Sequence, residues 1–209
     1  MQYPRQSIEL QNLLKEDQDE WKEFAKIEFE SGYKKQPKIE KLRKELRQRV
    51  QERASKMLII LDKIKEPSIH NIGQESALAM SVLATHTSLK TTKKVLKAFN
   101  DLYKLKPNDT RYQSIPAMTD WVAFLEHRPE TFGTIWIFDN NSYPFLPTVK
   151  DFNDVNIRRE RYGIEPLHWP KSLAIPLSKQ PWLKKPLTQL VMREPTDEEY
   201  HSNADPYLD

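Results

Sequence analysis

The side chains of this chain that could perform acid–base chemistry are few and widely spaced. His86, Glu75 and Asp120 are candidate catalytic residues, because an imidazole beside a carboxylate can transfer a proton near neutral pH. Glu75 and His86 share one face of a predicted helix, about 16 Å apart at about 1.5 Å per residue. They cannot bind one metal ion together, and a zinc site would need His86 with Asp120 or His127. We expect neither a metal nor a cofactor, and a hydrogen-bonded core histidine is the competing interpretation of His86.

The sequence gives little support for catalysis by a serine, threonine or cysteine nucleophile. Thr134, Ser76 and Ser81 supply hydroxyl groups, but no serine lies in a GxSxG turn. The chain has no cysteine, which excludes a thiolate nucleophile and a disulfide scaffold, and its four glycines form no phosphate-binding loop. The sequence therefore leaves open whether the protein is an enzyme.

A second group of side chains is suited to binding. Aromatic residues are dense between positions 121 and 145, and an arginine pair follows them; an arginine fork can bind a carboxylate or phosphate. The competing interpretation is structural, since Asp154 lies four residues before Arg158 and could pair with it. The candidate residues for binding a ligand or partner are Trp121, Phe132, Thr134, Trp136, Tyr143, Arg158 and Arg159.

The composition favours long solvated helices. Charged residues make up 30% of the 209 residues and hydrophobic residues 38%, while the net charge of +3 is too small to indicate a nucleic-acid partner. No apolar run approaches about 18 residues, so we expect no membrane span, and with no secretion pattern we expect a cytoplasmic protein.

Apolar residues at helical spacing predict helices over residues 6–30 and 37–65, joined by a short turn into an antiparallel hairpin. The first helix is acidic, with eight acidic and three basic residues over 9–30, and the second is basic, with ten basic and three acidic over 34–56. Residues 38–56 could bind nucleic acid. We favour pairing between the two helices, because no aromatic residues are interleaved with the basic ones.

Shorter elements follow. The pattern predicts helices over 74–87, 89–104 and 115–127, a strand over 134–138, an Asn-Asn turn, and a return segment over 142–147 that two prolines restrict to an edge. Asn153 or Asp154 would begin the helix that carries the arginine pair. From residue 168 the chain is rich in proline, contains Trp169 and Trp182, and ends acidic; it cannot form its own core, and we expect it to cover the hairpin or reach a partner.

The order of several short motifs resembles a bacterial family without an assigned activity, over roughly residues 10–167. The matching segments are Asp17-Gln18, Gly73-Gln74-Glu75, Thr85-His86, Asp120-Trp121, Phe132-Gly133-Thr134-Ile135, Arg158-Arg159 and Gly163-Ile164. Polar family residues are replaced here at Thr85, Trp121, Phe132 and Ile135. This loss of polar groups shifts the expectation from catalysis towards binding.

The sequence thus predicts a mainly α-helical domain over residues 1–167, comprising a long helical hairpin (1–66) and helices with one β-hairpin (67–167). A proline-rich extension occupies 168–209. The favoured function is binding of a partner protein or small ligand through the aromatic hairpin and the arginine-containing helix. A hydrolase using His86 with Glu75 or Asp120 is the alternative.

Overall fold

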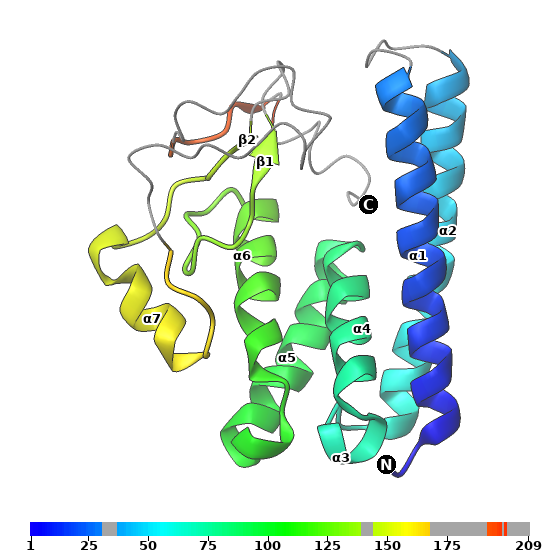
Figure 1. Cartoon of the computed structure of the whole chain (residues 1–209), viewed down its shortest axis with the longest axis vertical. Helices are drawn as coiled ribbons and strands as arrows, with labels where there is room; N and C mark the ends of the chain where they lie inside the picture. Colours follow the sequence, from blue (N-terminus) through cyan, green and yellow to red (C-terminus); the bar gives the residue numbers. More distant parts are fainter. Residues whose placement is uncertain (31–36, 139–143, 168–191, 198, 200–209) are drawn as a thin grey trace. The chain divides into compact units, whose positions relative to one another are not determined.

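A computed structural model of the chain describes residues 1–30, 37–138, 144–167, 192–197 and 199 (Figure 1). The protein is mainly helical, as predicted. It forms two compact units, of which the first comprises Met1–Met118 and the second begins at Thr119.

The first unit begins with two long helices, α1 (Pro4–Glu30) and α2 (Pro37–Ile64), which lie side by side (Figure 1). Each starts with proline, whose fixed φ suits the first helical turn. They run antiparallel, because Glu20 pairs with Arg49 whereas the earlier Asp17 pairs with the later Arg53. The apolar contact between them contains Phe24, Ile39, Leu46 and Val50, with Trp21, Ile27 and Leu42 at its edge.

Three further helices complete the core of this unit: α3 (Ile69–Ile72), α4 (Gln74–Thr85) and α5 (Leu89–Leu105). Ser68 and Ser88 cap α3 and α5 by accepting hydrogen bonds from the backbone N–H groups of Asn71 and Thr91. Helix α4 is rich in alanine and serine and packs closely on α1, where the hydroxyls of Ser7 and Ser76 lie 2.6 Å apart. Small side chains permit this close approach, and the paired hydroxyls satisfy each other inside the contact.

Two 3₁₀ turns, η1 (Pro107–Asp109) and η2 (Tyr112–Ser114), lead into α6 (Ile115–Leu125). The division between the units falls within α6, between Met118 and Thr119.

The second unit contains short elements: β1 (Ile137–Phe138), β2 (Pro144–Phe145), η3 (Phe152–Asp154) and α7 (Val155–Arg161). The two strands pair antiparallel, with Ile137 opposite Phe145. This pairing is much shorter than the predicted strand over 134–138. The predicted Asn-Asn turn lies outside the described residues, so the hairpin itself remains a prediction. Asp154 occupies the N-cap of α7 as expected, but its side chain makes no capping hydrogen bond.

A segment near the end of the chain returns to β2. Met192 forms a bridge with Leu146, and the guanidinium of Arg193 lies 3.8 Å from the centre of the Phe145 ring. Arg193 also pairs with the buried carboxylate of Glu199. Among the described residues of the extension, Met192 and Arg193 make this contact; Trp169 and Trp182 lie outside the described residues.

Candidate functional site

The most densely hydrogen-bonded group of predicted residues surrounds Asp120, in the second unit. Its carboxylate is fully buried at the inner face of α6. It accepts hydrogen bonds from the backbone N–H groups of Thr131 (2.7 Å), Phe132 (3.0 Å) and Thr134 (2.9 Å). The Thr134 hydroxyl donates a further bond of 2.8 Å. Asp120 therefore fixes the backbone of residues 130–135, hereafter the 130–135 loop.

A second carboxyl group, Glu130, lies at the start of this loop and is also fully buried. It accepts a hydrogen bond from the Ile135 N–H at Oε2. Burial, and secondly the negative charge of Asp120, raise the pKa of Glu130 to about 10. None of the described residues donates a hydrogen bond to the other oxygen, Oε1. When Glu130 is protonated, however, its carboxyl group can donate a hydrogen bond to Asp120. The pair thus consists of a neutral carboxylic acid beside a carboxylate. Two negative charges at this short range would repel each other, which favours keeping one of the two groups protonated.

The arginine pair of α7 binds the same loop from its carbonyl side. Arg158 donates from Nε to the Thr131 carbonyl at 2.8 Å and also to the carbonyls of Lys150 and Asp151. Arg159 donates from Nη1 to the Phe132 carbonyl at 2.7 Å and from Nε to the Glu165 carbonyl at 2.6 Å.

The loop therefore has carboxyl groups on its N–H side and guanidinium groups on its C=O side. The guanidinium donors go to backbone carbonyls and not to Asp154, the partner that helical spacing indicated. Such bonds between charged groups and the backbone are stronger than neutral ones, so this short loop has little freedom to change shape.

The predicted binding residues differ in their exposure. Trp121 and Phe132 are buried, with Trp121 stacked on Phe124, while Thr134 is half-buried. Trp136 is 39% exposed at the end of the loop, and the next residue, Ile137, is buried, as strand alternation predicts. Tyr143 lies outside the described residues. Of the described members of this set, Trp136 is the side chain best placed to meet another molecule.

His86 belongs to the first unit and has a partner that the candidate list did not contain. Its Nδ1 lies 2.6 Å from Oδ2 of Asp17 in α1, 69 residues earlier. The Asp17 side chain is 1% exposed and the His86 side chain 23% exposed, with the Trp21 ring packed against the imidazole edge. Which of these two atoms is the donor depends on the tautomer of the imidazole; in the tautomer with the proton on Nδ1, His86 donates to Asp17 and Nε2 can accept a proton.

Asp17 also begins a chain of charges between α1 and α2. Its Oδ1 lies 3.2 Å from Nη2 of Arg53, whose Nη1 lies 2.7 Å from Glu20. Glu20 in turn pairs with Arg49 at 3.0 Å. These pairs match the interpretation that the basic helix pairs with the acidic one, and Arg53 at 5% side-chain exposure is buried between them.

The sequence indicated two other partners for His86, Glu75 and Asp120. Glu75 is exposed in the first turn of α4, whereas His86 follows the last turn of the same helix. Asp120 belongs to the second unit and is bound by the 130–135 loop. Sequence reasoning thus missed Asp17, Arg53 and Glu130 as site residues. The sequence feature that could have indicated Asp17 is its place in the Asp17-Gln18 motif. No sequence feature indicated Glu130.

Two absences concern the described residues alone. Among them, no three His, Asp or Glu side chains converge as a metal site would require. None of the helices described has the length and apolar character needed to cross a membrane.

Comparison of the chain with family models, curated proteins and solved structures finds no match. The resemblance noted from the motifs therefore remains an expectation, and a functional proposal must rest on the geometry of the two sites.

Proposed function

We propose that the chain is a binding protein that recognises a partner protein through Trp136 and the 130–135 loop that precedes it. The observation that supports this most is the double attachment of the loop, by Asp120 and Glu130 on one side and Arg158 and Arg159 on the other. Burying ionisable groups is unfavourable unless each finds partners, and each of these four side chains has a backbone group of this loop among its partners.

A loop fixed before binding loses little conformational entropy when it meets a partner. Tryptophan is among the residue types that contribute most to protein interfaces. Trp136, two-fifths exposed at the end of this loop, is suited to enter a pocket on a partner protein. In this proposal Arg158 and Arg159 shape the surface by binding its backbone and do not contact the partner's charges.

The test begins with a photo-crosslinking amino acid at position 136, expressed in the native host. The matched control carries it at Ile157, which is 53% exposed on α7 of the same unit. A protein crosslinked from 136 and not from 157 is purified, and its affinity is measured by titration calorimetry. Trp136→Ala should weaken binding at least tenfold and Ile157→Ala less than twofold. Equal affinities for the two variants, or no specific crosslink from 136, would contradict the proposal.

A second candidate function is acid–base catalysis at His86. The contact between a buried Asp17 and a partly exposed imidazole favours it, because a base oriented by a carboxylate is a recurring catalytic arrangement. Activated carboxylate and phosphate esters are the probes. His86→Ala should reduce hydrolysis at least a hundredfold, and Asp17→Asn should also reduce it by disturbing the tautomer. If hydrolysis by the unmodified protein equals that of His86→Ala, this candidate is excluded.

A further inference from the structure

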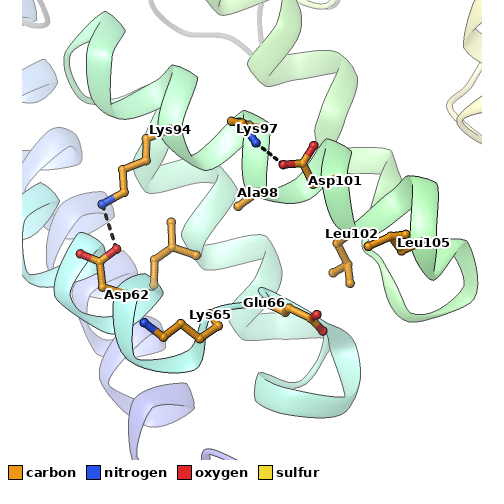
Figure 2. Close-up of a pocket in the computed structure, with 10 residues that line it drawn as sticks. Asp62, Lys65, Glu66, Lys94, Lys97, Ala98, Asp101, Leu102 and Leu105 are labelled. Carbon is orange, nitrogen blue, oxygen red and sulfur yellow. Dashed lines mark hydrogen bonds and ion pairs between the residues drawn. The ribbon is translucent and has the colours of Figure 1, made fainter.

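A hollow of about 290 Å³ lies between the C-terminal end of α2 and α5 in the first unit (Figure 2). Charged residues at its border already pair within the unit, since the ammonium of Lys94 lies 2.9 Å from Asp62. Lys97 likewise pairs with Asp101 along α5. These pairs do not indicate an occupant. Unpaired backbone groups are more informative, because their positions specify the main chain that would satisfy them, and β1 in the second unit presents such groups.

The backbone groups of β1, which lies beside β2 in Figure 1, alternate between the two edges of the strand. Ile137 lies opposite Phe145, and Phe138 lies opposite Pro144. In an antiparallel pair, opposed residues alternately exchange two backbone hydrogen bonds and none. Proline has no N–H, so Phe138 and Pro144 are not an exchanging pair. Ile137 therefore exchanges both bonds with Phe145, and the N–H and C=O groups of Trp136 and Phe138 point away from β2.

The opposite edge of β2 supports this assignment. Leu146 follows Phe145, and its carbonyl accepts a hydrogen bond of 3.2 Å from the Arg193 N–H. The backbone groups of Leu146 thus face the extension, and those of Phe145 face β1. Met192 and Arg193 occupy this edge of the sheet, so β2 already pairs with a backbone segment that is distant in sequence.

The outer edge of β1 has no such cover among the described residues. The N–H groups of Thr134 and Ile135 donate to buried carboxyl groups, so the available edge begins at Trp136. At Trp136 and Phe138, no residue in the described part of the chain pairs with the backbone groups that point away from β2. We call these groups the β1 edge. They are two N–H and two C=O groups, and the 39% exposed Trp136 side chain lies beside them.

We propose that the partner protein recognised through Trp136 binds as an extended strand that pairs with the β1 edge. This proposal rests on the proposed function and adds the conformation of the partner segment. Unpaired N–H and C=O groups along a strand edge are satisfied by another extended backbone, which is a recurring mode of peptide recognition. The Trp136 ring packs against the partner side chain that lies opposite it in the added strand. The main chain thus sets the register, and the tryptophan selects the sequence.

Amide hydrogen exchange of the full chain, followed by NMR, tests the β1 edge. In the free chain the N–H of Ile137 should exchange slowly and those of Trp136 and Phe138 rapidly. Saturation with the purified protein that crosslinks from position 136 should slow exchange at Trp136 and Phe138 at least tenfold more than at Ile137.

Three outcomes of this measurement would overturn the proposal. Protection of Trp136 and Phe138 in the free chain at every concentration would show that the edge is already covered. Protection that rises with the concentration of the chain alone would assign the edge to a second copy. Unchanged exchange in the complex would show that the partner contacts Trp136 without pairing with the strand.

A matched pair of variants tests one donor of the β1 edge. Phe138→Pro removes the outward N–H and keeps the bonds between Ile137 and Phe145, since proline is tolerated where a strand N–H faces outward. Phe138→Ala controls for the loss of the ring. In titration calorimetry with the same partner, Phe138→Pro should bind at least tenfold more weakly than Phe138→Ala, with equal midpoints of urea denaturation. If Phe138→Pro lowers that midpoint, the exchange measurement on the unmodified chain decides.

The results separate this proposal from the function on which it rests. Equal affinities of Phe138→Pro and Phe138→Ala, together with weak binding by Trp136→Ala, would overturn strand pairing and leave recognition through Trp136 intact. The absence of a specific crosslink from position 136 would overturn both.

Discussion

Glu130 is the residue whose chemistry departs most from its behaviour in water. Its pKa of about 10 means that it keeps a proton throughout the neutral range, because of burial and the charge of Asp120. As a neutral acid it can both donate to Asp120 and accept from Ile135, whereas an ionised carboxylate could only accept. The protonated form is therefore part of the folded structure of the 130–135 loop.

This property predicts a pH-dependent stability. Between pH 4.5 and about 10 the unfolded Glu130 is ionised while the folded one is protonated, so unfolding releases a proton and stability falls as pH rises. The contribution of this group to the slope approaches about 1.4 kcal/mol per pH unit. In Glu130→Gln, the amide retains both hydrogen bonds without titrating. Urea denaturation should show that variant gaining stability over the unmodified protein steadily from pH 5 to pH 9.

The exposed Glu160 provides the control for this comparison. Glu160→Gln removes a carboxyl group without removing a buried one, and its stability relative to the unmodified protein should change little over the same range. A constant difference between Glu130→Gln and the unmodified protein from pH 5 to pH 9 would show that Glu130 ionises normally.

Position 133 requires glycine for two reasons, its positive φ and the lack of space for a Cβ atom. Its φ is +66°, and an added Cβ would lie 2.9 Å from Cδ2 of Leu167 and 3.2 Å from Cγ2 of Val149. Gly133→Ala should therefore destabilise the protein by about 2–3 kcal/mol, measured by urea denaturation. Adding Leu167→Ala should recover part of that loss, since it removes the closest contact and leaves the backbone strain and the contact with Val149. Additive losses in the double variant would show that crowding by Leu167 contributes nothing.

At the scale of elements, the α1–α2 pair depends on a buried charge cluster. Replacing Arg53 with methionine leaves the buried Asp17 without this guanidinium partner and should cost about 3–5 kcal/mol. Arg49→Met breaks a pair whose arginine side chain is 44% exposed and should cost at most about 1 kcal/mol. Urea denaturation followed by circular dichroism at 222 nm compares the two. Similar losses would mean that Asp17 does not depend on Arg53.

The elements also show where sequence patterns succeed. Helical spacing of apolar residues predicted α1, α2, α4, α5 and α6 with ends within two residues, because α1, α2 and α5 each bury one face and α4 and α6 are apolar along most of their length. The strand predicted over 134–138 is shorter for a specific reason. The N–H groups of Thr134 and Ile135 donate to Asp120 and Glu130, so they cannot join a ladder, and pairing begins only at Ile137.

The candidate sites were predictable only in part. Strand propensity cannot reveal that carboxylates compete for the N–H groups of a segment. The contact of His86 with Asp17 spans 69 residues and depends on how α1 packs on α4, which residue types alone do not specify. Arg158 and Arg159 were recognised as a cluster, but their carbonyl partners lie on loops whose path the sequence does not show.

At the scale of the whole molecule, the units divide within α6. Met118, Trp121 and Phe124 are all buried along this helix, so no change in composition marks the division. Sequence reasoning places a boundary at residue 167, where proline content rises. The two boundaries differ because amino-acid composition indicates whether a segment can form a core, whereas contacts in the structure show which residues share the same core.

The return of Arg193 to β2 predicts a response to acid. Hydrogen bonding to Arg193 lowers the pKa of Glu199 to about 2, so the pair stabilises the segment above pH 4.5 and loses this effect as pH falls towards 2. Hydrogen exchange should show protection of residues 192–197 decreasing over that range. Glu199→Gln should have low protection already at pH 5. Unchanged protection between pH 5 and pH 2 in the unmodified protein would contradict this prediction.

The position of Asp17 between α2 and α4 has a consequence for the order of folding during synthesis. Its partner Arg53 and the apolar contact around Phe24 are supplied by α1 and α2, which emerge from the ribosome before α4. Its second partner, His86, follows the last turn of α4 and emerges later. We expect a stage in the nascent chain in which α1 and α2 are paired while the face of α1 bearing Ser7 is not yet covered by α4. During that interval this face is open to chaperones, although it is closed in the finished protein.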